Sequence, residues 1–209
     1  MKITSIKGIV AGLGLSVYTG LFGIPTAQAR YTHPVIQQNI EDTFTKTTEV
    51  TPHGISDSLA LKYAPKPVVT IQNIKRKVAI VVDLSKNILY HYNDKGEVQN
   101  AYLVASGKHS TPTGKGVRVV SHIESYPYST APISTKRRKH PWNYGPNAII
   151  VKKLDPRTGV TSQTGEFIHG NNDFSSLGKY ASQGCIRMDN EVIKKLAKII
   201  KRGDLILIK

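Results

Sequence analysis

The sequence predicts a mostly β domain of sandwich or barrel type with one α-helix late in the chain. Short runs rich in valine and isoleucine recur from about residue 68 of the 209 residues, and such runs favour strands. Loops rich in proline and glycine separate these runs. One amphipathic stretch near the end has helical spacing. Many short strands with a single helix are typical of a sandwich or a barrel.

The strands are predicted in chain order from their β-branched and apolar residues. Val78–Val82 is typical of a buried strand. Asn87–Tyr92 and Val98–Ala105 flank Asn93–Gly96, whose residue types suit a hairpin turn. Further strands are predicted at Val117–Ile123, Ala148–Lys152, Glu166–His169 and Asp204–Ile208.

The predicted helix covers Glu191–Lys201. Its apolar residues share one face at helical spacing, namely Val192, Ile193, Leu196, Ala197 and Ile200. Asp189 or Asn190 can cap its start, and Gly203 can close its end.

Residues 1–29 are predicted to be a signal peptide. Lys2 and Lys7 precede an apolar run, and Ala27 and Ala29 are the small residues that a signal peptidase requires. An uncleaved membrane anchor is the alternative, but glycines shorten the apolar run below the roughly 20 residues that span a bilayer. We therefore expect an exported protein, secreted to the cell wall or periplasm, that meets the membrane only through this segment.

The remainder divides into a spacer over residues 30–75, which we predict to be poorly ordered, and a folded domain over residues 76–209. The spacer holds threonine, proline and mixed charges without a sustained apolar period. Short helices around Val35–Phe44 and Ile55–Tyr63 are compatible with its sequence, but disorder is the simpler interpretation.

The chain is strongly basic. Its net charge of +15 falls to +13 without the signal peptide, because that segment holds two lysines and no acid. Outside a cell such a charge favours anionic cell-wall polymers and lipid headgroups over nucleic acid. The alternative is that the charge only keeps the domain soluble. Lys136–Lys139 is by default a solvated basic run, and we hypothesise that it touches anionic wall polymers.

Cys185 is the only cysteine of the chain, so it has no disulfide partner within it. A lone thiol in an oxidising compartment is a liability unless it is buried or used. His169 lies sixteen residues earlier, at the end of a predicted strand. A cysteine nucleophile needs such a base to form its thiolate. Spacing alone leaves a buried structural thiol beside an unrelated histidine equally open.

The residues beside the cysteine carry further hypotheses. Gly184 permits close backbone approach next to the sulfur and frees amide groups that can hold an oxyanion. Ser182 either hydrogen-bonds near the site or shapes the turn. The upstream block Thr111–Gly114 suits a structural turn better than a substrate contact. Trp142 and Tyr144 either line a flap over the substrate or pack as ordinary aromatic residues.

Three separated blocks, Ser110–Gly114, His169–Gly170 and Ser182–Arg187, resemble the YkuD-type L,D-transpeptidase family in order and spacing. The likeness covers about Lys77 to Lys209. The resemblance implies a β-sandwich-like catalytic domain with an active site under a flap.

The resemblance also implies a role for each matched residue. Cys185 would be the nucleophile and His169 its base, with the carbonyl of Gly170 orienting the imidazole ring. The amides of Gly184 and Cys185 would form the oxyanion hole. Arg187 would steady the site or meet a substrate carboxylate.

The implied reaction is a two-step acyl transfer between peptidoglycan stem peptides. Cys185 would attack the carbonyl of the third stem residue, release D-alanine and pass the thioester to an amine of a second stem. No cofactor is required, and the histidines outside the site lack metal-ligand spacing. Gln183 replaces a histidine that many members carry, which argues against a proton carrier there.

Three alternatives remain. An L,D-carboxypeptidase would use water as the acceptor, and the sequence does not separate it from a transpeptidase. An inactive wall-binding module would need a damaged histidine–cysteine pair. A papain-like endopeptidase places its cysteine before its histidine, whereas this chain has the reverse order.

Overall fold

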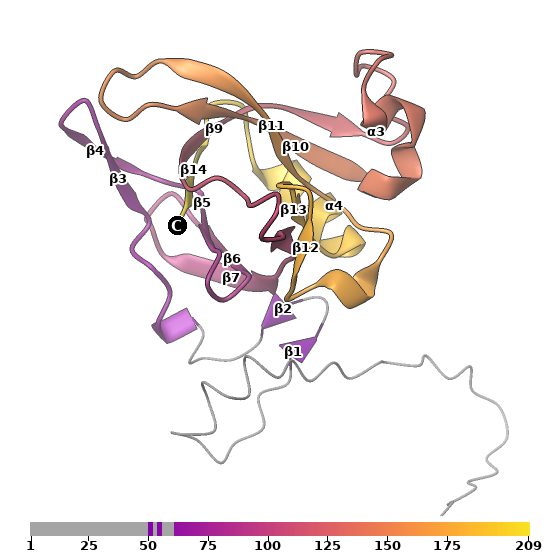
Figure 1. Cartoon of the computed structure of the whole chain (residues 1–209). Helices are drawn as coiled ribbons and strands as arrows, with labels where there is room; N and C mark the ends of the chain where they lie inside the picture. The colour runs from indigo at the N-terminus through magenta and orange to yellow at the C-terminus, as the bar shows by residue number, and fades with distance from the viewer. Residues whose placement is uncertain (1–49, 52–53, 56–60) are drawn as a thin grey trace, which may run out of the picture.

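The computed structural model describes residues 50–51, 54–55 and 61–209 (Figure 1). The predicted signal peptide, the segment Val35–Phe44 and most of Ile55–Tyr63 lie outside these residues. Within the described part of the chain, no helix has the length and apolar character needed to cross a membrane.

Two short antiparallel hairpins precede the main sheet. β1 (Val50–Thr51) pairs with β2 (Gly54–Ile55), and β3 (Val68–Ile71) pairs with β4 (Ile74–Lys77). The turn between β3 and β4 has positive φ at both central residues, as tight hairpins require. Strands therefore form inside residues 30–75, the predicted spacer, and ordered structure begins before residue 76.

The main sheet has eight strands in the order β13-β11-β10-β9-β14-β5-β6-β7. β14 pairs in parallel with β5, and β11 pairs in parallel with β13, whereas the other pairs are antiparallel. The strands are β5 (Ile80–Asp83), β6 (Ile88–Tyr92), β7 (Val98–Leu103), β9 (Gly116–Ser125), β10 (Asn147–Leu154), β11 (Thr161–His169), β13 (Ile186–Arg187) and β14 (Leu205–Ile208).

The two edges of this sheet meet. Ala105, just beyond β7, accepts a backbone hydrogen bond from Arg187 of β13 at 2.9 Å and donates one to it at 2.8 Å. The sheet therefore curls on itself, as the long curved strands in Figure 1 show. The predicted mostly β class of sandwich or barrel type is confirmed.

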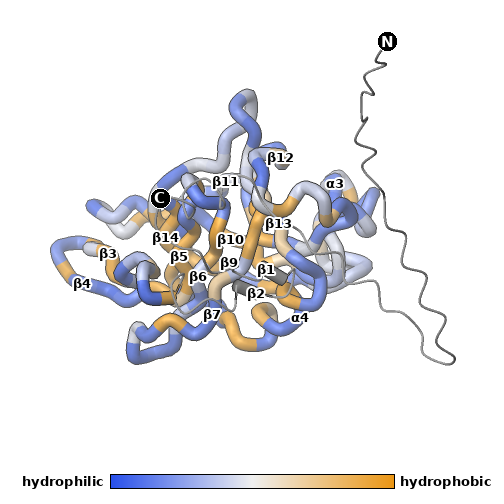
Figure 2. The backbone as a smooth tube through the Cα atoms, turned by 90° about the horizontal axis from the view of Figure 1, so that it is seen from below, coloured by the Kyte–Doolittle hydropathy of each residue, from blue (hydrophilic) through white to orange (hydrophobic). Residues whose placement is uncertain are grey.

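The β-branched runs occur where the sheet is covered on both faces. On β5, Ile80 and Val82 enter the core cluster that includes α4, while Val81 enters a second cluster on the other face. A strand buried on both sides needs apolar residues at successive positions, not alternate ones. Figure 2 shows the hydrophobic segments gathered in the central strands, with the β3–β4 hairpin and α3 largely hydrophilic.

The late helix, α4 (Asn190–Ile199), confirms the predicted helix with a shorter C-terminal end. The carboxylate of Asp189 caps it by accepting from the amides of Glu191 at 2.8 Å and Val192 at 3.1 Å. The helix ends two residues before the predicted limit, because Ile200 adopts an extended conformation with φ −69° and ψ 138°.

Several short elements lie outside the predicted set. They are α3 (Lys136–Lys139), the 3₁₀ turns η1 (Pro141–Tyr144) and η2 (Phe174–Ser176), and a parallel pair formed by β8 (Ser106–Gly107) and β12 (Tyr180–Ser182). α3 and η1 belong to residues 126–146, which join β9 to β10 and are called the cap segment below.

Candidate active site

The two candidate catalytic residues come from neighbouring parallel strands. His169 ends β11 and pairs with Arg187, while Ile168 pairs with Ile186. Cys185 immediately precedes β13 and therefore lies beside Phe167. Strand spacing and rise place the Cα atoms of His169 and Cys185 about 8 Å apart.

Alternation along these strands puts the candidates on one face. Ile168 and Ile186 both enter the buried core, so the residues on either side of them point the other way. His169, Cys185 and Arg187 thus share the face that lies under the cap segment.

One aromatic ring from the cap segment and one from β11 pack against the histidine. The centre of the His169 ring lies 4.9 Å from that of Tyr144 and 5.3 Å from that of Phe167. The Tyr144 and Phe167 rings are themselves 5.5 Å apart. Tyr144 therefore packs directly on the site, whereas Trp142 is 58% exposed and contacts the ring of His140.

His169 is buried and electrically neutral at neutral pH. Burial is the main cause that lowers its pKa from 6.5 to about 3, and the positive charge of Arg187 acts in the same direction. The carbonyls of Gly170 and Tyr144 lie near the ring and oppose this shift. Even so, Nδ1 has no hydrogen-bond partner of good geometry. The neutral ring has a lone pair for a proton, and its burial makes it a weaker base than a free imidazole.

Cys185 carries a free, half-buried thiol. Its Sγ lies 4.0 Å from the carbonyl oxygen of Gly165. Burial raises the pKa of the thiol to about 11, and the charge of Glu166 adds to this, while the Phe167 amide and the charge of Arg187 act against it. In the ligand-free protein the sulfur is therefore protonated at neutral pH.

Hydrogen bonds fix the loop of residues 182–185, called the nucleophile loop below. The Ser182 hydroxyl donates to the carbonyl of Cys185 at 2.5 Å and accepts from the amide of Gly184 at 3.1 Å. Ser182 is 1% exposed, so its hydroxyl serves the loop from inside. The Gly184 amide, expected as one oxyanion donor, is already engaged by Ser182.

The upstream threonine block packs against the same loop. Thr113 donates to the carbonyl of Gly184 at 2.9 Å, and Thr111 donates to the carbonyl of Ser182 at 3.3 Å. Two blocks separated by 71 positions thus meet at the nucleophile loop.

Arg187 is half-buried beside the histidine and cysteine. No carboxylate within residues 61–209 forms an ion pair with its guanidinium. Its charge lowers the pKa of His169 and of Cys185. The guanidinium of Arg187 therefore places a positive charge at the edge of the site.

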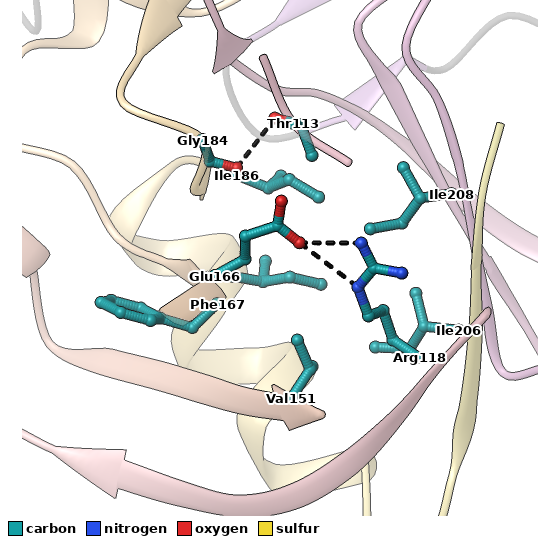
Figure 3. A pocket seen from close by; sticks show the side chains of 10 residues that line it. Thr113, Arg118, Val151, Glu166, Phe167, Gly184, Ile186, Ile206 and Ile208 are labelled. Carbon is teal, nitrogen blue, oxygen red and sulfur yellow. Dashed lines mark hydrogen bonds and ion pairs between the residues drawn. The ribbon is translucent and has the colours of Figure 1, made fainter. Parts of the chain in front are cut away.

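A buried ion pair under the nucleophile loop escaped the sequence analysis. Glu166 of β11 binds Arg118 of β9 at 2.8 Å and also accepts from the Gly114 amide at 2.8 Å. Both side chains line a small cavity with Thr113 and Gly184 (Figure 3). Arg118 and Glu166 are 48 residues apart in the sequence, and no sequence pattern predicts that they form a pair.

A second ion pair corrects the interpretation of Lys136–Lys139 as a solvated run. Arg137 donates to the carboxylate of Glu124 on β9 at 2.5 and 3.0 Å, and the Glu124 side chain is only 1% exposed. The guanidinium carbon of Arg137 also lies 5.5 Å from the centre of the Phe167 ring. Nothing in the sequence distinguishes Arg137 from its basic neighbours as the residue that binds a buried acid.

Metal ligands are absent from the described part of the chain, where no group of three histidine, cysteine or acidic side chains could hold an ion. The reactive and polar groups of the site are a thiol, a neutral imidazole, backbone amides and the guanidinium of Arg187. Cysteine–histidine acyl transfer uses groups of these kinds.

Comparison with known sequences identifies the family. The profile of the YkuD L,D-transpeptidase catalytic domain matches residues 77–208, more than half of the chain. The chain belongs to this family, as its three sequence blocks predict.

Individual relatives are more distant. A putative L,D-transpeptidase YkuD of Bacillus licheniformis is 53% identical over 36 residues, which are 17% of this chain and 22% of that protein. A structure of a mutant Enterococcus faecium L,D-transpeptidase is 23% identical, with a TM-score of 0.46, and covers 64% of this chain and 50% of that one. A Bdellovibrio bacteriovorus structure is 25% identical, with a TM-score of 0.47, and covers 70% and 53%. The chain thus spans about a fifth of the curated relative and about half of these two structures.

Proposed function

We propose that the protein is a peptidoglycan L,D-transpeptidase that works through a thioester on Cys185. One observation carries the proposal: a free thiol and a neutral, buried imidazole lie on the same face of adjacent strands in a domain of this family. A nucleophile and its base need this mutual reach.

The first half-reaction forms the thioester. The imidazole of His169 takes the proton of the Cys185 thiol, whose Sγ lies 4.0 Å from the Gly165 carbonyl oxygen in the ligand-free protein. The sulfur bonds to the carbonyl carbon of the diamino acid third in a stem peptide. The bond to D-alanine then breaks, and His169 returns its proton to the leaving amine.

The second half-reaction reverses these roles. An amine of a neighbouring stem attacks the thioester carbonyl, and His169 accepts a proton from it. The carbon–sulfur bond then breaks, and His169 passes this proton to the departing sulfur. The product is a peptide bond between third residues. Proton and bond changes balance without a cofactor.

Two negative charges of the substrate are stabilised in this scheme, the oxyanion and a carboxylate of the stem. The amide of Cys185 donates to the oxyanion that develops on the carbonyl oxygen. The Gly184 amide joins it only if it leaves the hydroxyl of Ser182. Arg187 attracts a carboxylate of the stem, because no acid in the described residues neutralises its charge.

The test uses a tetrapeptide stem and measures release of D-alanine. We expect Cys185→Ala to abolish release while its circular dichroism spectrum and unfolding midpoint match those of the parent. A folded Cys185→Ala protein that releases D-alanine at the parental rate would refute the assignment of the nucleophile.

An L,D-carboxypeptidase is the nearest alternative, since water can replace the acceptor amine. Incubation of one labelled stem peptide separates the two activities by product. A cross-linked dimer supports transpeptidation, while a trimmed monomer without dimer supports the carboxypeptidase. An inactive wall-binding module would give neither product.

Export belongs to the same proposal. A basic start, an apolar run and small residues at positions 27 and 29 support cleavage after Ala29. N-terminal sequencing of protein recovered outside the cytoplasm should begin at Arg30. A start at Met1 in the mature protein would show that the segment is retained as an anchor.

Anionic cell-wall polymers are the second proposed partner. Within α3 only Arg137 has an acidic partner among the described residues, while Lys136 and Lys139 are exposed. We expect Lys136→Gln with Lys139→Gln to weaken binding to purified walls at low salt. The control is Lys195→Gln with Lys198→Gln on α4, which removes equal charge elsewhere. Equal binding by both double variants would remove α3 from the interaction.

A further inference from the structure

Thr113 is a buried residue whose hydroxyl both accepts and donates a hydrogen bond. It is 6% exposed. Its Oγ1 accepts a hydrogen bond from the amide of Gly107 at 2.8 Å and donates one to the carbonyl of Gly184 at 2.9 Å. The second bond is drawn in Figure 3, where Thr113 approaches the nucleophile loop from the side of the small cavity.

The carbonyl that Thr113 binds belongs to the same peptide group as the Cys185 amide. A trans peptide is planar, and its C=O and N–H point in opposite directions. A hydrogen bond that holds the Gly184 carbonyl therefore also sets the direction of the Cys185 N–H. That N–H points away from Thr113.

The peptide group needs such a restraint because a glycine precedes it. Gly184 has a φ of +109°, in a region that other residues rarely adopt. Glycine passes easily between backbone conformations, so the plane of the Gly184–Cys185 peptide is not fixed by local sterics. A hydrogen bond from outside the loop supplies the missing constraint.

Thr113 is itself held firmly. Its β-branched side chain has few rotamers, and the Gly107 amide fixes the hydroxyl from the other side. A Cβ atom on Gly107 would collide with the backbone of Thr111 and Thr113. The threonine block therefore wraps closely around Gly107, with little freedom to move.

We propose that Thr113 is a positioning residue of the acyl-transfer reaction, which aims the Cys185 N–H at the oxyanion of the substrate. The inference rests on the proposed function, in which this amide stabilises the developing charge. Thr113 does not contact the substrate and acts only through the Gly184–Cys185 peptide. Donors held in place before the reaction stabilise such charge best.

Thr111 provides a matched control from the same block. Its hydroxyl donates to the carbonyl of Ser182 at 3.3 Å, and the amide of that peptide group belongs to Gln183, which is exposed. Loss of the Thr111 hydroxyl removes a hydrogen bond to the same loop. It leaves the peptide group of the Cys185 amide untouched.

The experiment compares Thr113→Val, Thr113→Ser and Thr111→Val in the full chain. D-alanine release gives kcat and KM, and alkylation of Cys185 by iodoacetamide reports on the thiol alone, since alkylation forms no oxyanion. We expect Thr113→Val to lower kcat about 100-fold with KM nearly unchanged and alkylation near the parental rate. Thr113→Ser, which keeps the hydroxyl, should restore most of kcat, and Thr111→Val should leave it within a few-fold of the parent.

Two outcomes would overturn the proposal. One is a Thr113→Val enzyme with the kcat of Thr111→Val. The other is a parallel loss of alkylation and acyl transfer in Thr113→Val, which would mean a general collapse of the loop. If Thr113→Val does not fold, Thr113→Ser and Thr113→Ala are compared by the ratio of kcat to the alkylation rate. Equal ratios in these two variants also overturn the proposal. An active Cys185→Ala protein would instead refute the proposed function itself.

Discussion

The nucleophile loop, which ends at Cys185, and the cap segment, which supplies Tyr144, are held in different ways. Hydroxyls of Ser182, Thr111 and Thr113 bind backbone groups of the nucleophile loop from buried or half-buried positions. The cap segment is held to the rest of the domain by the Arg137–Glu124 ion pair, the Tyr144 ring and an Asn172–Asn143 hydrogen bond of 2.8 Å. Within the segment, buried Tyr128 donates to the carbonyls of Tyr144 and Gly145 at 2.9 Å.

This difference in contacts corresponds to two roles, orienting peptide groups and covering the site. Hydrogen bonds to a backbone fix the orientation of peptide groups, which oxyanion stabilisation demands. Side-chain contacts hold a segment in place without setting each of its peptide planes. The cap segment also exposes Ile133 at 79% and Trp142 at 58%. The cap segment covers the histidine, while in the proposed reaction the nucleophile loop would orient the reacting groups.

The largest expected effect comes from breaking the cap's ion pair. Arg137→Met leaves the buried carboxylate of Glu124 without its bidentate partner, which should cost about 3 kcal/mol of unfolding free energy. Arg138→Met on the same helix is the control and should change stability by less than about 0.5 kcal/mol. Urea unfolding measures both. Equal stability of the two variants would show that the ion pair does not hold the cap segment.

The free energy of unfolding should depend on pH through His169, which is packed against the cap segment. The unfolded chain binds a proton at this residue below pH 6.5, whereas the folded chain resists until about pH 3. The unfolded state therefore binds more protons in this window, and stability falls as pH falls. Between pH 7 and 5 the loss from His169 is about 2 kcal/mol.

The matching variants isolate this contribution. His169→Asn should flatten the stability profile between pH 7 and 5, although buried His91, whose pKa is also lowered by burial, leaves a residual slope. Gln99→Asn, at an exposed position without an ionisable group, should keep the parental slope. A parental slope in His169→Asn would contradict the buried, neutral ring.

Loss of the Ser182 hydroxyl tests the nucleophile loop. Ser182→Ala leaves the Gly184 amide and the Cys185 carbonyl without this partner, and the expected loss is about 1–2 kcal/mol. Thermal unfolding, with exposed Ser134→Ala as the control, measures it. An unchanged midpoint would mean that the hydroxyl contributes nothing to the loop.

The smallest effect is expected at the outer surface of the cap segment. Trp142→Ala removes a ring that is 58% exposed and contacts His140, so stability should change by less than about 0.5 kcal/mol. A loss above 2 kcal/mol in urea unfolding would place the ring in a packing role that its exposure does not suggest.

The sequence was most informative where burial dictates residue type. β5, β6 and α4 are covered on their apolar faces, so their β-branched runs and helical spacing predicted them. β13 has two residues and no pattern of its own, yet its parallel pairing with β11 brings Cys185 beside His169. Spacing along the chain carries no such information about register.

Pairings between distant side chains were beyond prediction for a similar reason. Arg118 meets Glu166 because the sheet order places β9 near β11, and Arg137 meets Glu124 because the cap segment returns to β9. Thr113 matched a family block, but its local sequence suggested a turn. Its bond to the Gly184 carbonyl depends on tertiary structure.

The proposed reaction requires the Cys185 sulfur to be an accessible nucleophile served by His169. Intact-protein mass spectrometry after incubation with a carbapenem tests it directly, because an acylated thiol adds the mass of the drug. We expect one adduct on the parent, none on Cys185→Ala and much slower formation on His169→Asn. No adduct on the parent, or an equal adduct on Cys185→Ala, would contradict the claim.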